Sequence, residues 1–365
     1  MKIKRKLLSI LTILFIGFSS GVLTSCELNS TELEFTLLED GSGYSVTGIS
    51  ERAENFTKIT IPSEYNSKPV LGIGYSALSV LENNQMKYVR TIIIPDSVTS
   101  IGKAAFGGCE SLKKITIPDS VTSIASSAFE NCISLKEIKV SSNNESFDSR
   151  NNCNAIIKTA TDTLIIGCKN TKIPDSVTSI GNSAFFRCSS LTSITIPDSV
   201  TSIGDVAFAS CESLKNITIN HGVTSIGDDA FNSCTSLTSI DIPDSVTSIG
   251  EGAFNGCSSL KNVNIPDSIT SIDFATFGGC SSLTSITIPD GVTTIGRFVF
   301  GECSSLESII IPDSVTSIGE GTFNLCGSLK TVYYTGTKEQ WNIISIEYNN
   351  DYLINATIIY NYVEE

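Results

Sequence analysis

The sequence contains a single histidine, His221, and this scarcity limits the chemistry that the chain can perform. A hydrolytic triad needs a histidine or an equivalent base to accept the proton of the nucleophile. His221 stands in Asn220-His221-Gly222, where related segments have Pro-Asp-Ser or Pro-Asp-Gly, so we interpret it as a turn variant. Paired carboxylates of the glycosidase kind are not marked by any pattern. We therefore predict no catalytic residues and no enzyme, with a glycan-active enzyme as a distant alternative.

Cationic residues are also scarce, with 24 Lys and Arg against 38 Asp and Glu. Four of the 24, namely Lys2, Lys4, Arg5 and Lys6, lie in a segment that we expect to be removed, which leaves a net charge of 20 − 38 = −18. A surface this acidic argues against nucleic acid as a partner and against adsorption to anionic lipid.

Long apolar runs are confined to the start of the chain. Residues 1–25 combine a basic beginning, an apolar core at 7–18 and small residues before Cys26, which predicts a secretory signal peptide. The ending Leu23-Thr24-Ser25-Cys26 resembles a bacterial lipobox, and the resemblance implies cleavage before Cys26 and lipidation of its thiol. An ordinary signal peptide is the alternative. No other segment is long and apolar enough to span a bilayer, so we expect membrane contact through a lipid anchor only.

What the sequence has in abundance is a repeat of 23 residues. It is clearest in one column of cysteines, with Phe three residues before each and Leu three residues after each. A fixed period of this size indicates a solenoid, in which equivalent residues stack into layers. The column comprises Cys109, Cys132, Cys188, Cys211, Cys234, Cys257, Cys280, Cys303 and Cys326, with one longer gap after Cys132.

Each unit reads as one coil of the solenoid, as in residues 240–262, IDIPDSVTSIGEGAFNGCSSLKN. The I-x-I spacing predicts a half-buried strand, and Pro243-Asp244-Ser245 predicts a turn. A second short extended run ends at Gly250, and residues 251–255 have room for about one helical or 3₁₀ turn. The apolar residues of a single unit cannot be enclosed by that unit alone, so burial must come from the coils above and below.

The pattern L-x-x-I-x-I-P-x-x-V-x-x-I-G-x-x-A-F-x-x-C-x-x resembles the BspA-like class of bacterial leucine-rich repeats, from about residue 61 to residue 331. The resemblance implies a right-handed superhelix of the leucine-rich-repeat α/β type, rich in strands, and a surface protein that engages ligands of a host or of neighbouring cells. It does not identify the ligand.

We expect four regions. After the signal peptide, residues 26–60 form a linker and a cap hairpin, whose strands flank residues 39–43. Residues 61–331 form the solenoid, with a long repeat at about 138–170 that contains a second hairpin around 159–163. Residues 332–365 form an aromatic-rich C-terminal cap. The long repeat is either a contact site or a tolerated expansion.

Two columns and one cysteine pair need interpretation. The column thiols point the same way, which disfavours disulfides between them, and they run in a line, which disfavours a metal site. Outside the column, only Cys153 and Cys168 could form a disulfide. A second column could attract Ca²⁺, although capping of turns explains it more simply. It comprises Asp96, Asp119, Asp175, Asp198, Asp244, Asp267, Asp290 and Asp313. We predict no cofactor.

Outward positions beside the first strand of each unit are mostly small and polar. They form a flat face of hydroxyl and amide groups that could hold protein or glycan. The predicted binding face comprises Ser193, Thr195, Asn216, Thr218, Ser239, Asp241, Asn262, Asn264, Ser285 and Thr287. We therefore predict an exported lipoprotein of the cell surface that adheres to extracellular or host protein or glycan. An envelope protein with a structural or carbohydrate-scavenging role is the alternative.

Overall fold

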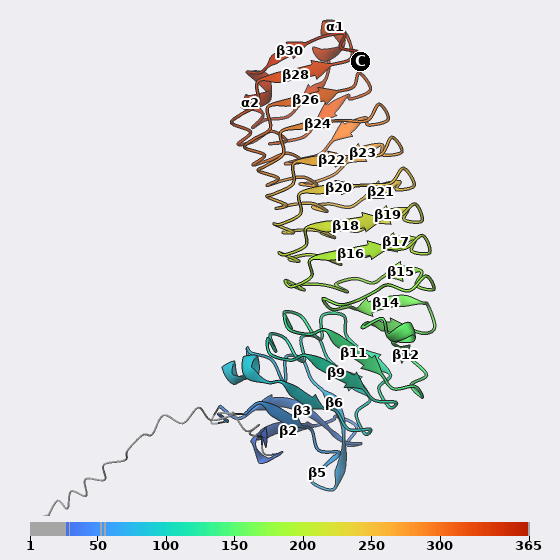
Figure 1. Ribbon diagram of the computed structural model, residues 1–365. Helices are drawn as coiled ribbons and strands as arrows, with labels where there is room; N and C mark the ends of the chain where they lie inside the picture. Colours follow the sequence, from blue (N-terminus) through green and yellow to red (C-terminus); the bar gives the residue numbers. More distant parts are fainter. Residues whose placement is uncertain (1–26, 29, 52, 55, 364–365) are drawn as a thin grey trace, which may run out of the picture.

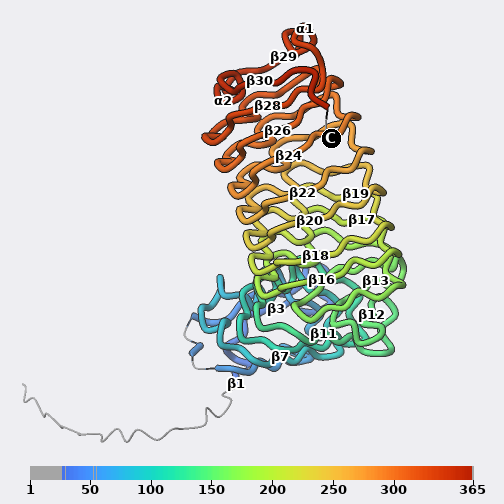
Figure 2. The backbone as a smooth tube through the Cα atoms, turned by 45° about the horizontal axis from the view of Figure 1, so that its top comes forward, coloured from blue at the N-terminus to red at the C-terminus, as the bar shows by residue number. Residues whose placement is uncertain are grey.

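The computed structural model describes residues 27–28, 30–51, 53–54 and 56–363. The signal peptide and Cys26 lie outside these residues. The chain forms a strand-rich solenoid whose coils stack from the N-terminal region to the C-terminal cap (Figure 1), and from β16 to β28 the coils lie one over another (Figure 2). The predicted repeat solenoid is confirmed.

The first strand of each coil follows the I-x-I pattern. In β16 (Ser193–Ile196) the two isoleucines are buried and the two polar residues are exposed, as a half-buried strand requires. Neighbouring coils pair in parallel one period apart, so that Ser193 lies opposite Asn216. The further strands of this kind are β4 (Lys58–Thr60), β7 (Thr91–Ile93), β9 (Lys114–Ile117), β11 (Glu137–Val140), β18 (Asn216–Ile219), β20 (Ser239–Asp241), β22 (Asn262–Asn264), β24 (Ser285–Thr287), β26 (Ser308–Ile311), β28 (Thr331–Tyr334) and β30 (Thr357–Ile359).

The second strand of each coil is two residues long and places its isoleucine in the core. These strands also pair in parallel with their copies. They are β8 (Ser100–Ile101), β10 (Ser123–Ile124), β15 (Ser179–Ile180), β17 (Ser202–Ile203), β19 (Ser225–Ile226), β21 (Ser248–Ile249), β23 (Ser271–Ile272), β25 (Thr294–Ile295), β27 (Ser317–Ile318) and β29 (Ser345–Ile346).

The turn between the two strands is held by backbone and serine groups. The Val246 N–H donates to the Pro243 carbonyl at 2.9 Å, and the Ser245 hydroxyl donates to the Val223 carbonyl of the preceding coil at 2.7 Å. In the described residues, hydrogen bonds reach the carboxylates of the aspartate column only at Asp119 and Asp313. The expected capping by aspartate is therefore wrong for most coils. In four coils the serine beside the aspartate donates to a carbonyl of the preceding coil instead, namely Ser120, Ser245, Ser268 and Ser314.

The third side of the coil is a run of turns, and the expected helical or 3₁₀ turn is absent from residues 251–255. Gly252 and Gly256 have φ of 62° and 71°, which lie in the left-handed region and are incompatible with a right-handed α- or 3₁₀-helix. Along residues 252–256, every second backbone N–H donates to a carbonyl of the next coil. The Phe254 N–H donates to the Thr276 carbonyl at 2.9 Å, and the Gly256 N–H donates to the Gly278 carbonyl at 2.7 Å. The third side is thus a ladder of turns.

The core is built from the repeated phenylalanine and cysteine columns. Phe254 lies between Phe231 and Phe277, with ring centroids 5.4 and 5.5 Å apart and nearly parallel planes. The thiol of Cys257 is buried and donates to the Phe231 carbonyl at 3.2 Å. A cysteine suits this position because its small side chain fills the layer and its S–H reaches a carbonyl of the coil before.

The N-terminal region continues both strand ladders. Its hairpin joins β2 (Leu33–Leu37) to β3 (Tyr44–Ile49), with Phe35 opposite Val46, which confirms the predicted strand pair. Strand β3 then pairs in parallel with β6 (Lys68–Ile73), so the hairpin extends the ladder of second strands beyond the first coil. The other elements are β1 (Glu27–Leu28), η1 (Ser30–Glu32), β5 (Glu64–Tyr65) and η2 (Asn84–Tyr88).

The C-terminal region adds two short helices, α1 (Lys338–Trp341) and α2 (Asp351–Ile354), while β29 and β30 extend the two ladders. The Trp341 ring meets the Tyr334 ring edge-on, with centroids 5.1 Å apart. Over the described part of the chain, neither helix has the length or the apolar character to cross a bilayer.

Candidate functional site

The ten residues of the predicted binding face lie together on the outer side of β16, β18, β20, β22 and β24, and all are exposed. Parallel pairing aligns them in two columns, with Ser239 opposite Asn262 and Asp241 opposite Asn264. We call this the first-strand surface. It comprises Ser193, Thr195, Asn216, Thr218, Ser239, Asp241, Asn262, Asn264, Ser285 and Thr287.

The first-strand surface is hollowed in two places, and all ten residues line one hollow or the other. The residues on β20, β22 and β24 line a hollow of about 390 Å³, in which Asp241 is the charged side chain. The residues on β16 and β18 line a hollow of about 660 Å³, whose other wall comes from residues 169–173, where the long repeat ends. The sequence did not predict that this wall belongs to the same site.

The long repeat forms a small antiparallel sheet of its own. It comprises β12 (Phe147–Asp148), the 3₁₀ turn η3 (Arg150–Asn152), β13 (Ile156–Lys158) and β14 (Thr163–Ile166). The pairing of β13 with β14 confirms the predicted hairpin. Strand β14 also pairs in parallel with β15, so the ladder of second strands begins again at the long repeat.

The core divides at the long repeat into two clusters of buried apolar residues. Phe129 ends one stack of rings and Phe185 begins the next, with Gly167 between the two stacks. A Cβ atom at Gly167 would lie 2.0 Å from the Phe185 ring, so the ring closes over the backbone only because this residue is glycine. The coils of β9 and β11 are tilted relative to those of β16 and β18 (Figure 1).

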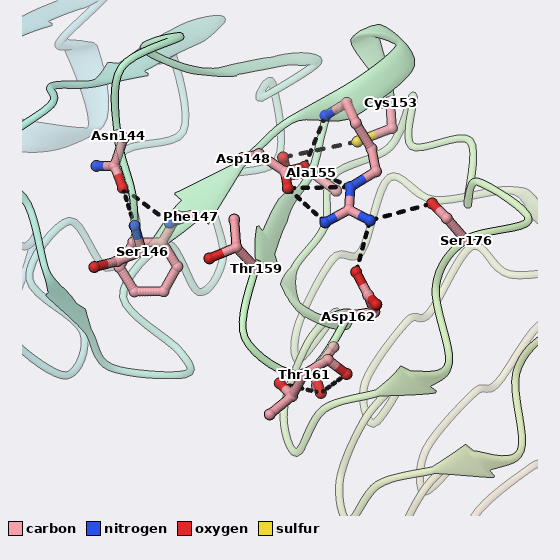
Figure 3. A network of polar contacts seen from close by, with 12 residues as sticks. Asn144, Ser146, Phe147, Asp148, Cys153, Ala155, Thr159, Thr161, Asp162 and Ser176 are labelled. Carbon is pink, nitrogen blue, oxygen red and sulfur yellow. Dashed lines mark hydrogen bonds and ion pairs between the residues drawn. The ribbon is translucent and has the colours of Figure 1, made fainter.

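Arg150 holds the long repeat together. Its guanidinium contacts Asp148 through Nε at 2.9 Å and Nη2 at 2.5 Å, and Asp162 through Nη1 at 2.6 Å, with Ser176 beyond (Figure 3). Partial burial of Asp148 would raise the pKa of its carboxyl, but the hydrogen bonds from Arg150 outweigh burial and hold that pKa below its ordinary value. We call Arg150, Asp148 and Asp162 the arginine clamp.

Asn144 fixes the other end of the insertion. Its buried amide accepts hydrogen bonds from the Ser146 and Phe147 N–H groups at 2.9 and 2.8 Å (Figure 3). The same amide donates to the Pro118 and Val121 carbonyls of the preceding coil at 2.7 and 2.9 Å. Arg150 and Asn144 thus fix the long repeat in position by side-chain hydrogen bonds. No sequence motif predicted either role.

The cysteines of the described residues are free thiols, including Cys153 and Cys168. Burial raises the pKa of the seven column thiols from Cys188 to Cys326, to about 12 for Cys234, so they are unsuited to metal binding or to nucleophilic attack at neutral pH. Among the described residues, no group of three or more His, Cys, Asp and Glu side chains is arranged to hold a metal ion.

His221 is exposed in a turn that the Val223 N–H closes on the Asn220 carbonyl. The neighbouring position, Gly222, accepts no side chain, since a Cβ atom there would lie 1.8 Å from the Asp198 carbonyl oxygen. The structure therefore places this histidine as the turn variant that its sequence context indicates.

Comparison with known proteins identifies the repeat. The family described as "BspA type Leucine rich repeat region (6 copies)" matches residues 81–162, 165–281 and 247–350. No curated protein matches the chain.

Several solved structures are similar over nearly the whole chain. A leucine-rich repeat protein from Eubacterium ventriosum has 21% identity, a TM-score of 0.57, and coverage of 92% of this chain and 95% of its own, which shows the shared fold. A leucine rich cell surface protein from Faecalibacterium prausnitzii has 27% identity, a TM-score of 0.41, and coverage of 88% and 98%. A leucine-rich repeat protein from Bacteroides ovatus has 25% identity, a TM-score of 0.43, and coverage of 90% and 98%.

Proposed function

Because the chain belongs to the BspA-type leucine-rich repeat family, we propose that it is a non-catalytic binding protein displayed on a bacterial cell surface. Its partner in this proposal is a protein or glycan of a host or of the extracellular medium. The observation that carries the proposal is the first-strand surface, where ten exposed polar residues from five strands align in columns and line two hollows. Repeated surfaces of this kind bind through many weak contacts spread over a large area.

The anchor is the second part of the proposal. Residues 1–25 direct export, and Cys26 becomes the lipidated N-terminus of the mature chain. Multiple acyl chains hold a protein on a membrane stably, whereas a single one does not. The solenoid is then presented from one end, with the first-strand surface along its side.

The chemistry of the two hollows supports binding over catalysis. Their linings contain amide, hydroxyl and lysine groups together with Asp175 and Asp241, but no histidine or cysteine. The two aspartates line different hollows, so neither hollow holds the carboxylate pair that glycoside hydrolysis requires.

A binding assay with a matched control tests the proposed surface. The soluble fragment 27–365 should bind host cells or matrix, and a variant with Glu at Ser193, Asn216, Ser239 and Asn262 should lose that binding. The four positions point outward, so the variant should remain folded by circular dichroism. The control adds the same charge at the exposed residues Thr178, Thr201, Thr224 and Thr247, each directly before a second strand. Because these hydroxyls donate to carbonyls of preceding segments, circular dichroism is also measured on the control.

Equal loss in both variants would show a general effect of charge and would contradict the assignment to the first-strand surface. Full binding by the folded first-strand variant would show that the binding site lies outside the first-strand surface. Display on the cell surface is tested separately by protease treatment of intact cells, which should cleave the chain. Protection from the protease would place the chain beneath the surface and would favour a role inside the envelope.

A further inference from the structure

The two hollows of the first-strand surface differ in charge. The smaller contains Asp241 and no cation, whereas the larger contains Lys169 and Lys172 with Asp175 as its acid. We call the larger hollow the lysine groove. It lies between residues 169–173, where the long repeat ends, and strands β16 and β18, and its volume is about 660 Å³. A site of net positive charge is unexpected in a chain whose formal net charge is −14.

Neither lysine is paired with a carboxylate of the described residues. Among the described residues, Lys169 and Lys172 take part in none of the ion pairs. Lys169 is half-buried and Lys172 is exposed. An ammonium group without a counter-ion in the protein is free to pair with an anionic ligand. The groove is therefore suited to an anion.

The wall that carries the lysines is held in place. The Thr171 hydroxyl accepts from the Cys168 N–H and donates to the Asn154 carbonyl, both at 2.8 Å. The Lys172 N–H donates to the Cys153 carbonyl at 3.0 Å. Because these bonds tie residues 168–172 to the segment that follows the arginine clamp, little conformational entropy remains to be lost when a ligand binds.

The rest of the groove offers neutral hydrogen-bonding groups. Four asparagines line it, namely Asn154, Asn170, Asn216 and Asn220, together with Ser193 and Thr195. Side-chain amides and hydroxyls both donate and accept, which matches the hydroxyl groups of a sugar. The lining has no aromatic residue and no arginine, the two kinds that dominate binding energy at protein interfaces. This composition favours a glycan over a protein.

We propose that the lysine groove binds an anionic glycan. In this arrangement Lys169 and Lys172 pair with carboxylate or sulfate groups of the polysaccharide, while the amides and hydroxyls of β16 and β18 bond its sugar hydroxyls. The inference rests on the proposed binding function and narrows it to one class of ligand and one end of the first-strand surface.

Binding of defined polymers to the soluble fragment 27–365 tests this inference. The probes are polygalacturonate for carboxylates, chondroitin sulfate for sulfates together with carboxylates, dextran as a neutral glycan and poly-glutamate as an acidic peptide. We expect one or both anionic glycans to bind and dextran not to bind. Replacing Lys169→Gln and Lys172→Gln together should weaken binding by on the order of tenfold to a hundredfold and reduce its salt dependence. The control replaces Lys261→Gln and Lys330→Gln, exposed lysines outside the groove, and removes the same charge.

Each outcome decides the inference. Loss in the groove variant with retention in the control supports it, and equal loss in both shows only long-range attraction and overturns it. Tighter binding of poly-glutamate than of either glycan assigns the groove to acidic peptides instead. Absence of binding to both anionic glycans also overturns it, while binding to host cells through the first-strand surface would still stand.

Discussion

The stacked rings of the core allow a quantitative test at Phe254. Its side chain is fully buried between Phe231 and Phe277, whose centroids lie 5.4 and 5.5 Å away. Truncation of a buried phenylalanine to alanine typically costs about 3–5 kcal/mol. Each lost ring contact accounts for roughly 0.5–1.5 kcal/mol beyond area burial.

Collapse of the neighbours should recover little of this cost. The Phe254 N–H donates to the Thr276 carbonyl of the next coil at 2.9 Å, and the Phe231 N–H donates to the Ala253 carbonyl at 2.8 Å. The backbone of both coils is therefore fixed around the cavity. We therefore expect Phe254→Ala to lower the free energy of unfolding by about 4 kcal/mol, within the range for rigid cores. Phe254→Leu fills much of the cavity but loses both ring contacts, so it should cost about 1–3 kcal/mol, less than Phe254→Ala.

Equilibrium unfolding of the fragment 27–365 in urea is the assay, followed by two probes. Circular dichroism reports all coils, whereas fluorescence of the single tryptophan, Trp341, reports the C-terminal region. Because each repeat contacts only its neighbours, the coils near Phe254 should unfold first in the variant, and the two probes should then give different midpoints. An unchanged midpoint by both probes for Phe254→Ala would refute the layered core.

Four further predictions concern the thiols, the anchor and the arginine clamp. With Cys26 excluded, the column cysteines should react with iodoacetamide only after denaturation, and mass spectrometry that finds a Cys234–Cys257 disulfide would contradict this. Burial raises the pKa of the column thiols from Cys188 to Cys326 in the folded state. The stability that these thiols contribute should therefore be fully present below about pH 8.5 and should fall as pH rises toward the folded values, measured as the urea midpoint from neutral to alkaline pH. Cys26→Ala should abolish lipidation and remove the chain from the detergent phase, and continued partitioning would require another anchor. Arg150→Lys keeps the charge but cannot contact both carboxylates at once, so it should lower the free energy of unfolding by about 1–2 kcal/mol. It should also speed amide hydrogen exchange in residues 146–166. Exchange at the wild-type rate would show that the arginine clamp does not stabilise the long repeat.

The repeat made much of the fold predictable. A period of 23 residues brings each position against its own copy in the next coil, so Phe254 and Cys257 could be assigned to buried layers without any knowledge of the coil's path. The polar positions beside the first strands could be assigned outward by the same logic, since side chains alternate along a strand. The columns are therefore a property of the sequence itself.

The path of each coil was decided by contacts between coils. Gly252 has a left-handed backbone, and so do Ala275 and Phe298 at the same position of the next two coils. Alanine and phenylalanine do not favour that conformation locally, so no local signal predicts it. Hydrogen bonds to the neighbouring coil impose it, and they replace the expected helical turn by a ladder of turns.

The candidate site depends even more on tertiary structure. Lys169 and Lys172 lie outside the regular pattern, and their sequence neighbours give no indication of a groove. They line one groove with Ser193 and Asn216 because hydrogen bonds from Thr171 and Lys172 tie their segment to residues 153–154 of the insertion. Periodicity specifies which residues stack, because stacking repeats the same contact. Where the period fails, the contacts between segments distant in sequence determine the surface, and these exist only in the folded chain.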